Sequence, residues 1–478
     1  MNITLRHILF SGLATMALTG AAITPEEVTK AVNLARESPK NRVLSRKAGI
    51  ALQEAGRYKD AITYYLKSDN SGNLGAAECY FYLYDYDKAE EYLDKYLEKR
   101  SKGEEEKDKD FSYGDGSETI DWTDNLRSRI ELGRSMLDRV EKIEIIDSIN
   151  VPSEEFFKFI KLAKSAGSLG DESVIDDVVT ETALQQLGVT SLWAPVYSSE
   201  SGDDVIWYGS TENGDSKLFE SIRLTDGSWD KPNELFDYAS IFGNANGSWV
   251  SYPFLMSDGV TLYFAADGEN SLGELDIFIS RRDSDGFLQP SNVGMPYNSP
   301  YNDYLYAIDE ENGVGWWASD RNQLKDSVTI YTFLPQELRV NYPVETPNLT
   351  DYARVKSIAM TQNESTDYQK ILKRIASSGS SKGKKSKMNF EFALPGGKII
   401  TSMSQLSNPQ SVNALNEYLS EKENYDRLRE ELASLRKAYA NRDKSVTDRI
   451  LLAEQELEDK KLELRRLKNR VVRLESRQ

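Results

Sequence analysis

Histidine and cysteine are almost absent from this chain of 478 residues, which has one of each, His7 and Cys79. A single cysteine cannot form a disulfide within the chain. Because His7 lies in a segment expected to be removed, zinc sites built from cysteine and histidine, Ser-His-Asp triads and acid–base chemistry by histidine are all excluded. The sequence indicates no catalytic, metal-binding or cofactor-binding residue. We therefore expect that the protein is not an enzyme.

Long hydrophobic runs are also missing after the first 22 residues. Residues 1–22 have the parts of a secretory signal peptide: basic Arg6, an apolar run from Ile8 to Leu18, and small residues up to Ala22. The run is too short to span a bilayer, and no cysteine follows it to carry a lipid anchor. We expect a periplasmic protein, free or peripheral at the outer membrane, without a transmembrane segment. The alternative is that this run is a buried first helix.

Basic residues are outnumbered, with 59 lysines and arginines against 77 acidic residues and a formal net charge of −18. Such an acidic chain repels phosphate backbones, so nucleic acid is excluded as a partner. Residues 411–478 differ, with 16 basic and 14 acidic side chains. The acidity therefore belongs to the body of the chain and not to its tail.

Residues 25–100 carry apolar side chains at spacings of three and four, which predicts helices. Tyr58 and Ala61 recur as Tyr86 and Ala89, 28 residues later. A repeated helix pair with a small residue at its tight contact predicts an α-solenoid, with a plain helical bundle as the alternative. The lone cysteine is expected to pack in the core of these helices, a reactive thiol being the alternative.

The architecture is predicted to change after these helices. Residues 101–121 are a charged loop, 123–141 a further helix, and 142–151 an alternating strand. From about 188 to 345 the chain is rich in glycine, asparagine, tryptophan and tyrosine, and it repeats. Three strands with paired aromatic residues align, each after a tight turn: Val205–Ser210 after Ser201–Asp204, Thr261–Ala266 after Ser257–Gly259, and Val314–Ser319 after Glu311–Gly313. A second strand follows each, at 218–219, 277–278 and 330–331.

A repeat of about 50 residues built from short aromatic strands predicts a β-propeller. One such unit cannot bury both of its faces, so several must stack around an axis. Closed propellers have at least four blades, and only three are visible in the sequence. The candidates for the missing strands are 142–151 and the pair Asn389–Phe392 with Lys398–Thr401.

The C-terminal part is predicted to be helical. Residues 350–376 read as helix, and Ser377–Lys387 as a flexible basic linker. The last 68 residues follow a heptad pattern that breaks at Asn441–Ser445. Two arms of nearly equal length, 411–440 and 446–476, predict an antiparallel coiled-coil hairpin; one continuous coiled coil between two chains is the alternative. The expected seam contains Leu432, Leu435, Leu457 and Leu464.

Acidic side chains in the propeller region could carry chemistry, but a structural role is favoured. Asp204, Asp226, Asp258 and Asp285 suggest a glycosidase pair, yet all lie in turns or beside glycine, where the backbone favours aspartate. The loop Asp267–Asp276 offers oxygen ligands for calcium, but without the spacing of an EF-hand, so an ordinary loop is favoured.

Paired aromatic residues in the same region suggest carbohydrate stacking. They are Trp207–Tyr208, Tyr263–Phe264 and Trp316–Trp317. Because neighbours on a strand face opposite sides of the sheet, core packing between blades is the favoured interpretation.

Short motifs in the middle of the chain resemble TolB-type, WD-repeat-like propeller blades. They are Ser257-Asp-Gly-Val-Thr-Leu-Tyr-Phe264 with Asp276-Ile-Phe278, supported by Tyr252–Gly259, Asn298–Asp303 and Ala318–Arg321. With helices that resemble tetratricopeptide repeats, the order of parts is similar to that of Bacteroidota envelope proteins, among them the periplasmic scaffold of type IX secretion and gliding. The resemblance covers about residues 25–345. Those scaffolds typically end in an OmpA-like domain that binds peptidoglycan, which this chain lacks, so anchoring to peptidoglycan is not implied.

The sequence thus predicts a multidomain α and β protein. Its parts are a signal peptide at 1–22, a tetratricopeptide-like α-solenoid at 23–141, a β-propeller at 142–405 with helical insertions and a basic linker at 377–387, and a coiled-coil hairpin at 406–478. The expected function is that of a non-catalytic periplasmic scaffold or adaptor that binds envelope proteins, with a hairpin that either docks a further partner or drives self-association. The alternative is a glycan-binding or glycan-processing propeller protein. No metal or other cofactor is expected.

Overall fold

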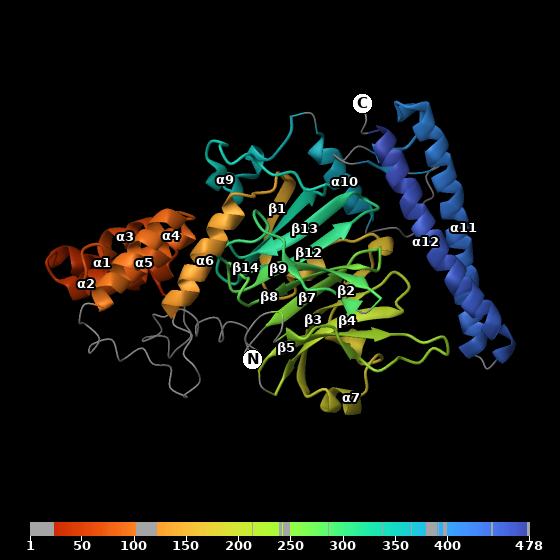
Figure 1. Cartoon of the computed structure of the whole chain (residues 1–478), viewed down its shortest axis with the longest axis horizontal. Helices are drawn as coiled ribbons and strands as arrows, with labels where there is room; N and C mark the ends of the chain where they lie inside the picture. Colours follow the sequence, from red (N-terminus) through yellow and green to blue (C-terminus); the bar gives the residue numbers. More distant parts are fainter. Residues whose placement is uncertain are drawn as a thin grey trace.

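The structure of the protein, a computed structural model, has three parts: N-terminal helices, a body of antiparallel strands, and two long C-terminal helices (Figure 1). It describes residues 23–475 apart from 102–121, 239–240, 242–248, 379–389, 395–398, 441–442 and the single residues 213, 285, 337, 365 and 391. The predicted signal peptide, nearly all of the charged loop 101–121 and most of the basic linker lie outside the described residues.

The described residues of the N-terminal part form six helices: α1 (Pro25–Glu37), α2 (Arg42–Glu54), α3 (Tyr58–Tyr65), α4 (Ser71–Tyr82), α5 (Tyr86–Ser101) and α6 (Trp122–Leu137). Each of the first five packs against the next in sequence, so that α2 with α3 and α4 with α5 form successive helix pairs. Ala61 and Ala89, the equivalent positions of the predicted repeat, are both completely buried. Cys79 is also completely buried, which confirms its predicted place in this core.

Tyr65 joins the two helix pairs. Its ring is 2% exposed, and its hydroxyl donates to Oε1 of Gln53 over 2.7 Å. Two glycines leave the space that the ring occupies: a Cβ atom at Gly49 would lie 2.7 Å from the ring, and one at Gly75 only 2.5 Å. The close approach of the helices therefore depends on glycine at these two positions.

The described part of the body forms three antiparallel sheets. The first has the order β2-β3-β4-β5-β6: Ser168–Gly170, Val189–Ser198, Asp204–Thr211, Ser216–Ile222 and Asn233–Glu234. The second has the order β10-β9-β8-β7, with β11 also paired to β9: Gly286–Phe287, Asp276–Asp283, Thr261–Ala266, Val250–Leu255 and Ser291–Asn292. The third has the order β1-β14-β13-β12: Glu144–Pro152, Ser327–Leu334, Val314–Ser319 and Asp303–Asp309. The three aligned strands of the sequence repeat are β4, β8 and β13, which have the same place in each sheet, as predicted.

The second sheet lies between the other two, and all three share one apolar core. Aromatic rings meet across both junctions: Tyr197 and Phe254 between the first and second sheets, and Tyr263 and Tyr306 between the second and third, with centroids 5.5 and 4.4 Å apart. Phe156, on the short 3-10 helix Phe156–Phe159, contacts rings of the second and third sheets. This turn therefore packs beside the first strands of those two sheets.

Helical segments cover the two ends of this row of sheets. Trp207 and Phe219 of the first sheet pack with Ile175 and Val178 of the segment that leads to α7 (Glu181–Gln186). At the third sheet, the 3-10 helix Ile358–Met360 and α10 (Tyr368–Ser378) lie against β1, while the short α9 (Leu349–Ala353) precedes them. A sheet face that a helix already buries has no surface left for a further sheet.

The prediction of a closed propeller needs correction for the residues that the structure describes. The strand predicted at 142–151 exists as β1, but it is the outermost strand of the third sheet, paired with β14, and not part of a fourth. The pair at 389–401 forms the separate two-stranded sheet β15 (Phe392–Ala393) and β16 (Ile399–Ile400), whose apolar side chains pack with the C-terminal helices. Likewise, the single helix predicted at 350–376 is divided into α9, a 3-10 turn and α10.

A buried polar network joins the second and third sheets. Arg321 donates to a carboxylate oxygen of Asp303 at 2.7 Å and to the carbonyls of Pro296 and Tyr297. The Asp303 amide donates to the carbonyl of Leu275 at the edge of the second sheet, over 2.7 Å. Burial raises the pKa of Asp303 to about 7, although the Arg321 guanidinium acts in the opposite direction. Asp303 and Arg321 both belong to the short motifs that resemble propeller blades. In this protein their side chains have a structural role, because they join two sheets.

The N-terminal helices are joined to the body through an apolar seam. Phe81, Tyr84, Ala89 and Leu93 from α4, α5 and their connection form one buried cluster with side chains of the body. The body contributes Leu272, Met295, Leu349 and Ala353. Arg129 of α6 also donates to the carbonyl of Leu272 over 2.7 Å. Helices and sheets therefore share a core and form one unit.

The C-terminal helices α11 (Pro409–Ala440) and α12 (Thr447–Glu475) form the predicted antiparallel hairpin within one chain. Asp443 caps the 3-10 turn between them by accepting from the Ser445 amide over 3.1 Å. Leu432 and Leu435 are buried in the seam, and Leu457 packs against it, as predicted. Leu464 is only half-buried and does not belong to this cluster, whose α12 members are Ile450, Ala453 and Leu457. No helix in the described ranges has the length and apolar character needed to cross a membrane.

Replacing Gly75 with valine should destabilise the N-terminal helices by about 2 kcal/mol, because the new side chain would overlap the buried Tyr65 ring. Thermal or urea unfolding followed by circular dichroism measures the change. The exposed Lys47→Val on α2 is the control and should cost only about 0.5 kcal/mol, the helix propensity of valine. In a double variant with Tyr65→Ala the two costs should not add, and full additivity would contradict the proposed overlap.

Candidate functional site

The paired aromatic residues are buried and offer no ring surface to a sugar. Trp207 and Trp317 are completely buried, and Trp316 is 4% exposed. Trp207 packs in the cluster beside α7, whereas its neighbour Tyr208 faces the shared core of the sheets. The prediction that these pairs are core residues on opposite faces of their strands is confirmed.

The acidic turn residues are mostly engaged by their own backbone. Asp226 accepts from the Ser228 amide over 2.9 Å, and Asp258 accepts from the amides of Val260 and Thr261 over 2.8 Å. Burial opposes ionisation of Asp258, but the hydrogen bonds from Thr261 and Val260 outweigh it and lower the pKa. Both aspartates are turn residues, as predicted, while Asp285 lies outside the described residues.

Asp204, the remaining member of that group, is in a different environment. It begins β4, and its carboxyl group lies beside Glu220 of β5, which forms an ion pair with Arg282 of the second sheet. Burial first, and then the charge of Glu220, raise the pKa of Asp204 to about 7. This carboxyl therefore accepts a proton far more readily than an exposed aspartate.

The loop Asp267–Asp276 also turns its carboxylates toward its own chain. Asp267 accepts a hydrogen bond from the Trp249 amide. Asp276 accepts from the amides of Leu272 and Gly273, at 2.8 and 2.9 Å. Burial raises the pKa of Asp267 to about 7 and that of Asp276 to about 6. Within the described ranges, no group of three or more acidic, cysteine or histidine side chains is placed to hold a metal ion.

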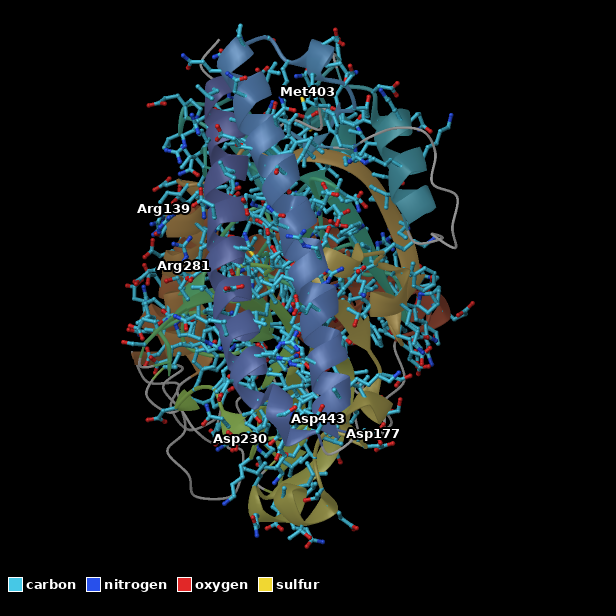
Figure 2. The ribbon with its side chains drawn as sticks, turned by 90° about the vertical axis from the view of Figure 1, so that its right-hand side faces the viewer. Arg139, Asp177, Asp230, Arg281, Met403 and Asp443 are labelled. Carbon is cyan, nitrogen blue, oxygen red and sulfur yellow. The ribbon has the colours of Figure 1, made fainter. Side chains whose placement is uncertain are left out.

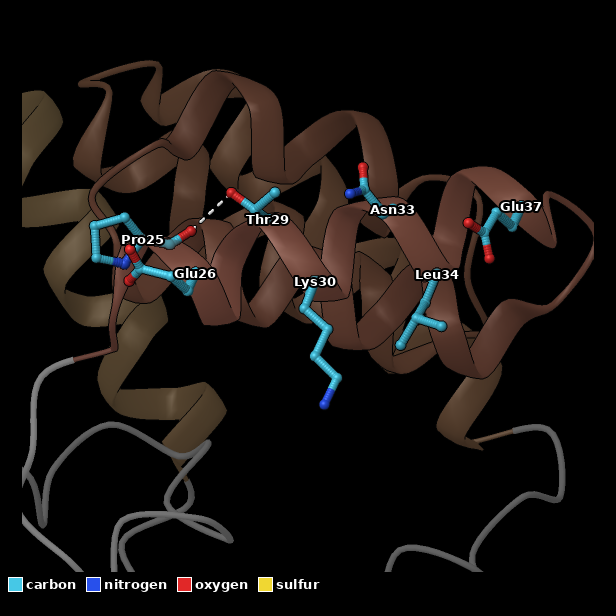
Figure 3. Close-up of a pocket in the computed structure, with 7 residues that line it drawn as sticks. All are labelled: Pro25, Glu26, Thr29, Lys30, Asn33, Leu34 and Glu37. Carbon is cyan, nitrogen blue, oxygen red and sulfur yellow. Dashed lines mark hydrogen bonds between the residues drawn. The ribbon is translucent and has the colours of Figure 1, made fainter.

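A shallow surface pocket lies on α1 (Figure 3). All of its described lining residues come from that one helix: Pro25, Glu26, Thr29, Lys30, Asn33, Leu34 and Glu37. In the close-up, their side chains project from one side of the helix and do not converge on a common point. A neighbouring groove between α1 and α2 is lined by Leu34, Leu44 and the stems of Lys30 and Lys47. These features are typical of a contact surface and not of an enclosed site.

The most organised polar arrangement is the contact between the C-terminal hairpin and the sheets. In each sheet, one turn joins the first long strand to the next: 199–203 between β3 and β4, 256–260 between β7 and β8, and 310–313 between β12 and β13. We call these three turns the turn row. They contain the glycine-bearing turns of the sequence repeat. The hairpin lies across this end of the sheets, with α11 and α12 side by side (Figure 2).

At the first turn, two arginines of α11 pair with acidic residues. Arg429 forms an ion pair with Glu200, and Arg436 forms one with Asp203. Arg436 also binds Glu454 of α12 at 2.8 Å, which ties this contact to the second helix of the hairpin. The two arginines are seven residues apart, so they face the same side of α11.

At the second and third turns, the contacts come from α12. Arg465 lies 3.3 Å from a carboxylate oxygen of Asp258, and Lys468 donates to the carbonyl of Glu310 over 2.9 Å. The Glu310 side chain accepts from the Ser257 hydroxyl, which joins the second and third turns. The hairpin therefore contacts one turn of every sheet.

Among the described side chains, no buried apolar cluster joins the hairpin to the three sheets. One apolar cluster of the hairpin contains only residues of α11, α12 and the turn between them. The other, at the base of the hairpin, adds only residues 390–406, among them Phe392 and Ile400 of the small sheet. The contacts described between the hairpin and the turn row are ion pairs and hydrogen bonds of charged side chains.

Sequence analysis predicted the turns and the hairpin but not their contact. The signal was present: acidic residues in the first turn, and arginines seven residues apart on α11. Heptad analysis considers the apolar positions, and so these arginines were read as part of a charge-balanced tail. Their acidic partners lie 229 and 233 residues away in the chain.

Buried carboxyl groups should make the body less stable as the pH rises. Asp204, Asp267 and Asp303 have folded-state pKa values near 7, above those of unfolded aspartate, so the folded state holds more protons between about pH 4 and 7. The protons bound by these carboxyl groups stabilise the folded state, and this contribution to the free energy of unfolding is lost as the pH rises through 7. The melting temperature should therefore be lower at pH 8 than at pH 6.

Asp267→Asn tests this expectation, because asparagine keeps an oxygen for the Trp249 amide but cannot ionise. The free energy of unfolding differs between pH 6 and pH 8, and this difference should be about 1 kcal/mol smaller in the variant than in the parent. Asp226→Asn is the matched control, since its carboxyl is exposed and its pKa is lowered by hydrogen bonds from Ser228. An Asp267→Asn variant with the pH dependence of the parent would contradict the assignment.

Comparison with known proteins returned no match to this chain among family models, curated proteins or solved structures.

Proposed function

We propose that the protein is a non-catalytic scaffold or adaptor, which acts in the periplasm and holds protein partners in an envelope assembly. The observation that carries this proposal is the single unit formed by the N-terminal helices and the sheets through their buried apolar seam. The hairpin contacts the other side of the sheets (Figure 1). The surfaces of the helices and of the sheets are thus held in a defined relation to each other.

Further support comes from the helix pairs. Their packing, with Ala61 and Ala89 at equivalent buried positions, is typical of tetratricopeptide-like arrays, which bind peptides or proteins on an exposed face. Leu34 and Val43 expose 41% and 48% of their surface on α1 and α2. In the proposed scaffold, the three sheets are the propeller-like part that connects the helices to the hairpin.

The cellular setting is proposed from the resemblance alone. A signal peptide, helical repeats and TolB-type motifs in this order are typical of Bacteroidota envelope scaffolds, including that of type IX secretion. We propose a partner protein as the contact of the C-terminal hairpin. The glycan alternative is not proposed further, because the aromatic pairs on which it rested are buried.

Cross-linking in the native envelope followed by mass spectrometry tests the scaffold function. The variant Leu34→Glu/Val43→Glu should lose at least one cross-linked envelope protein that the parent captures, because it replaces two exposed apolar side chains of α1 and α2 with charges. Leu288→Glu is the control, since Leu288 is 51% exposed on the body and should keep all cross-links. An identical set of cross-links in both variants would contradict a binding role for the helices.

Intact mass of the protein purified from its native cells tests the proposed compartment. We expect a mass that corresponds to removal of residues 1–22, because the segment has the order of parts that signal peptidase requires. Retention of Met1 would contradict export through this signal.

A further inference from the structure

The hairpin is held on the sheets in a different way from the N-terminal helices. The helices share a buried apolar cluster with the body, whereas the hairpin contacts the turn row through charged and polar groups. The ion-pairing side chains keep access to water: Arg429 and Arg436 are each 31% exposed, and Arg465 is 53% exposed. Partly exposed ion pairs contribute little net stability and are screened by salt.

The hairpin can keep its own fold without the sheets. Its seam is formed by its own residues, among them Leu432, Leu435 and Ile450. Its base is closed by Val471 and Leu415 with the small sheet β15–β16. Asn408 and Ser407, at the start of α11, also donate backbone hydrogen bonds to Glu475 at the end of α12. The contacts that would break on release from the turn row are therefore mostly separate from those that hold the hairpin together; Arg436 is shared, and its bond to Glu454 of α12 can persist after release.

The surface beneath the hairpin has a defined chemistry. Glu200 and Asp203 form ion pairs with two arginines of α11 that are seven residues apart. Asp258 forms an ion pair with a third arginine, on α12. Since the whole chain carries −18 and residues 411–478 carry +2, the rest carries −20. A surface of this charge and spacing is complementary to a basic helix, and its field would also speed the approach of one.

We propose that the hairpin is a removable arm, and that the turn row which it covers is a docking surface for a cationic helix of a partner protein. The hairpin and the partner compete for the same acidic side chains, so that partner binding and release of the arm are one exchange. The partner is a helix with arginine or lysine at seven-residue spacing, because the hairpin itself satisfies the surface in this way. The docking half of the proposal rests on the scaffold function; the release of the arm does not.

Release of the arm is measured in the full-length protein with a pair of spin labels. Cysteines replace the exposed Ser434 on α11 and Ser201 in the first turn, in a Cys79→Ala background, and pulsed electron paramagnetic resonance gives their distance distribution. The short distance should give way to longer ones as NaCl rises from about 50 mM to about 1 M, where the screening length is only about 3 Å. Circular dichroism should show unchanged helix content.

Charge reversal identifies the ion pairs responsible. Arg429→Glu/Arg436→Glu should release the arm at low salt, and adding Glu200→Lys/Asp203→Lys should restore the short distance. Recovery by the second pair of changes excludes simple misfolding of the first variant. Arg427→Glu/Lys437→Glu is the matched control, because these cations are exposed on the same helix. It should leave the short distance in place.

Docking is tested with a synthetic helical peptide that carries arginines at seven-residue spacing, by fluorescence anisotropy at low salt. Arg429→Glu/Arg436→Glu should bind it about tenfold more tightly than Glu200→Lys/Asp203→Lys, in which the arm is also released but the first turn is basic. A distance unaffected by salt and by charge reversal would overturn the removable arm, and equal peptide binding by the two variants would overturn the docking surface. Native cross-links that persist in either case would leave the scaffold function standing.

Discussion

The buried guanidinium of Arg321 joins the second sheet to the third, the part of the body that the N-terminal helices pack against. It is 8% exposed, neutralises Asp303 at the start of β12, and binds two carbonyls of the segment that connects the second sheet to the third. Burial raises the pKa of Tyr84, in the connection between α4 and α5, and the Arg321 guanidinium acts in the opposite direction; Tyr84 packs in the seam between the N-terminal helices and the body. Removing one partner of such a pair would leave an unpaired charge in the core, a cost of about 3–5 kcal/mol.

Two kinds of joint follow from how the chain distributes its apolar residues. Aromatic and aliphatic side chains such as Phe81 and Leu272 are placed where helices and sheets meet, so that separating them would expose apolar surface to water. The outer ends of the strands instead carry acidic turns, and the helices that meet them carry arginines. The strength of the apolar joint depends on the hydrophobic effect and therefore on temperature. The strength of the charged joint depends on the salt concentration. One chain therefore contains a permanent connection and an adjustable one.

The local features of this fold could be predicted from the sequence, and its long-range pairings could not. Strands β4, β8 and β13 were visible because aromatic pairs and glycine-bearing turns recur together, and the hairpin because heptads break at a capping aspartate, Asp443. The repeat indicates three sheets, the number that the structure describes in the body, but it does not indicate that the row ends at three. The row of sheets ends where the segment around Ile175 and α10 cover its outer faces. Neither segment has a sequence pattern from which this packing could be predicted. The pairing of β1 with β14, which joins residues nearly two hundred positions apart, was not predicted either.

The antiparallel course of the hairpin has a geometric consequence. The first turn of α11 and the last turn of α12 meet at one end, near Asn408 and Glu475, while Asp443 marks the opposite end. With 32 residues in α11, the distance between these ends is about 48 Å at 1.5 Å per residue. A swing about the base would thus carry the tip through an arc whose radius exceeds the width of a small domain. The volume that the tip can search grows with the cube of that radius, so a small change at the base is converted into a long reach.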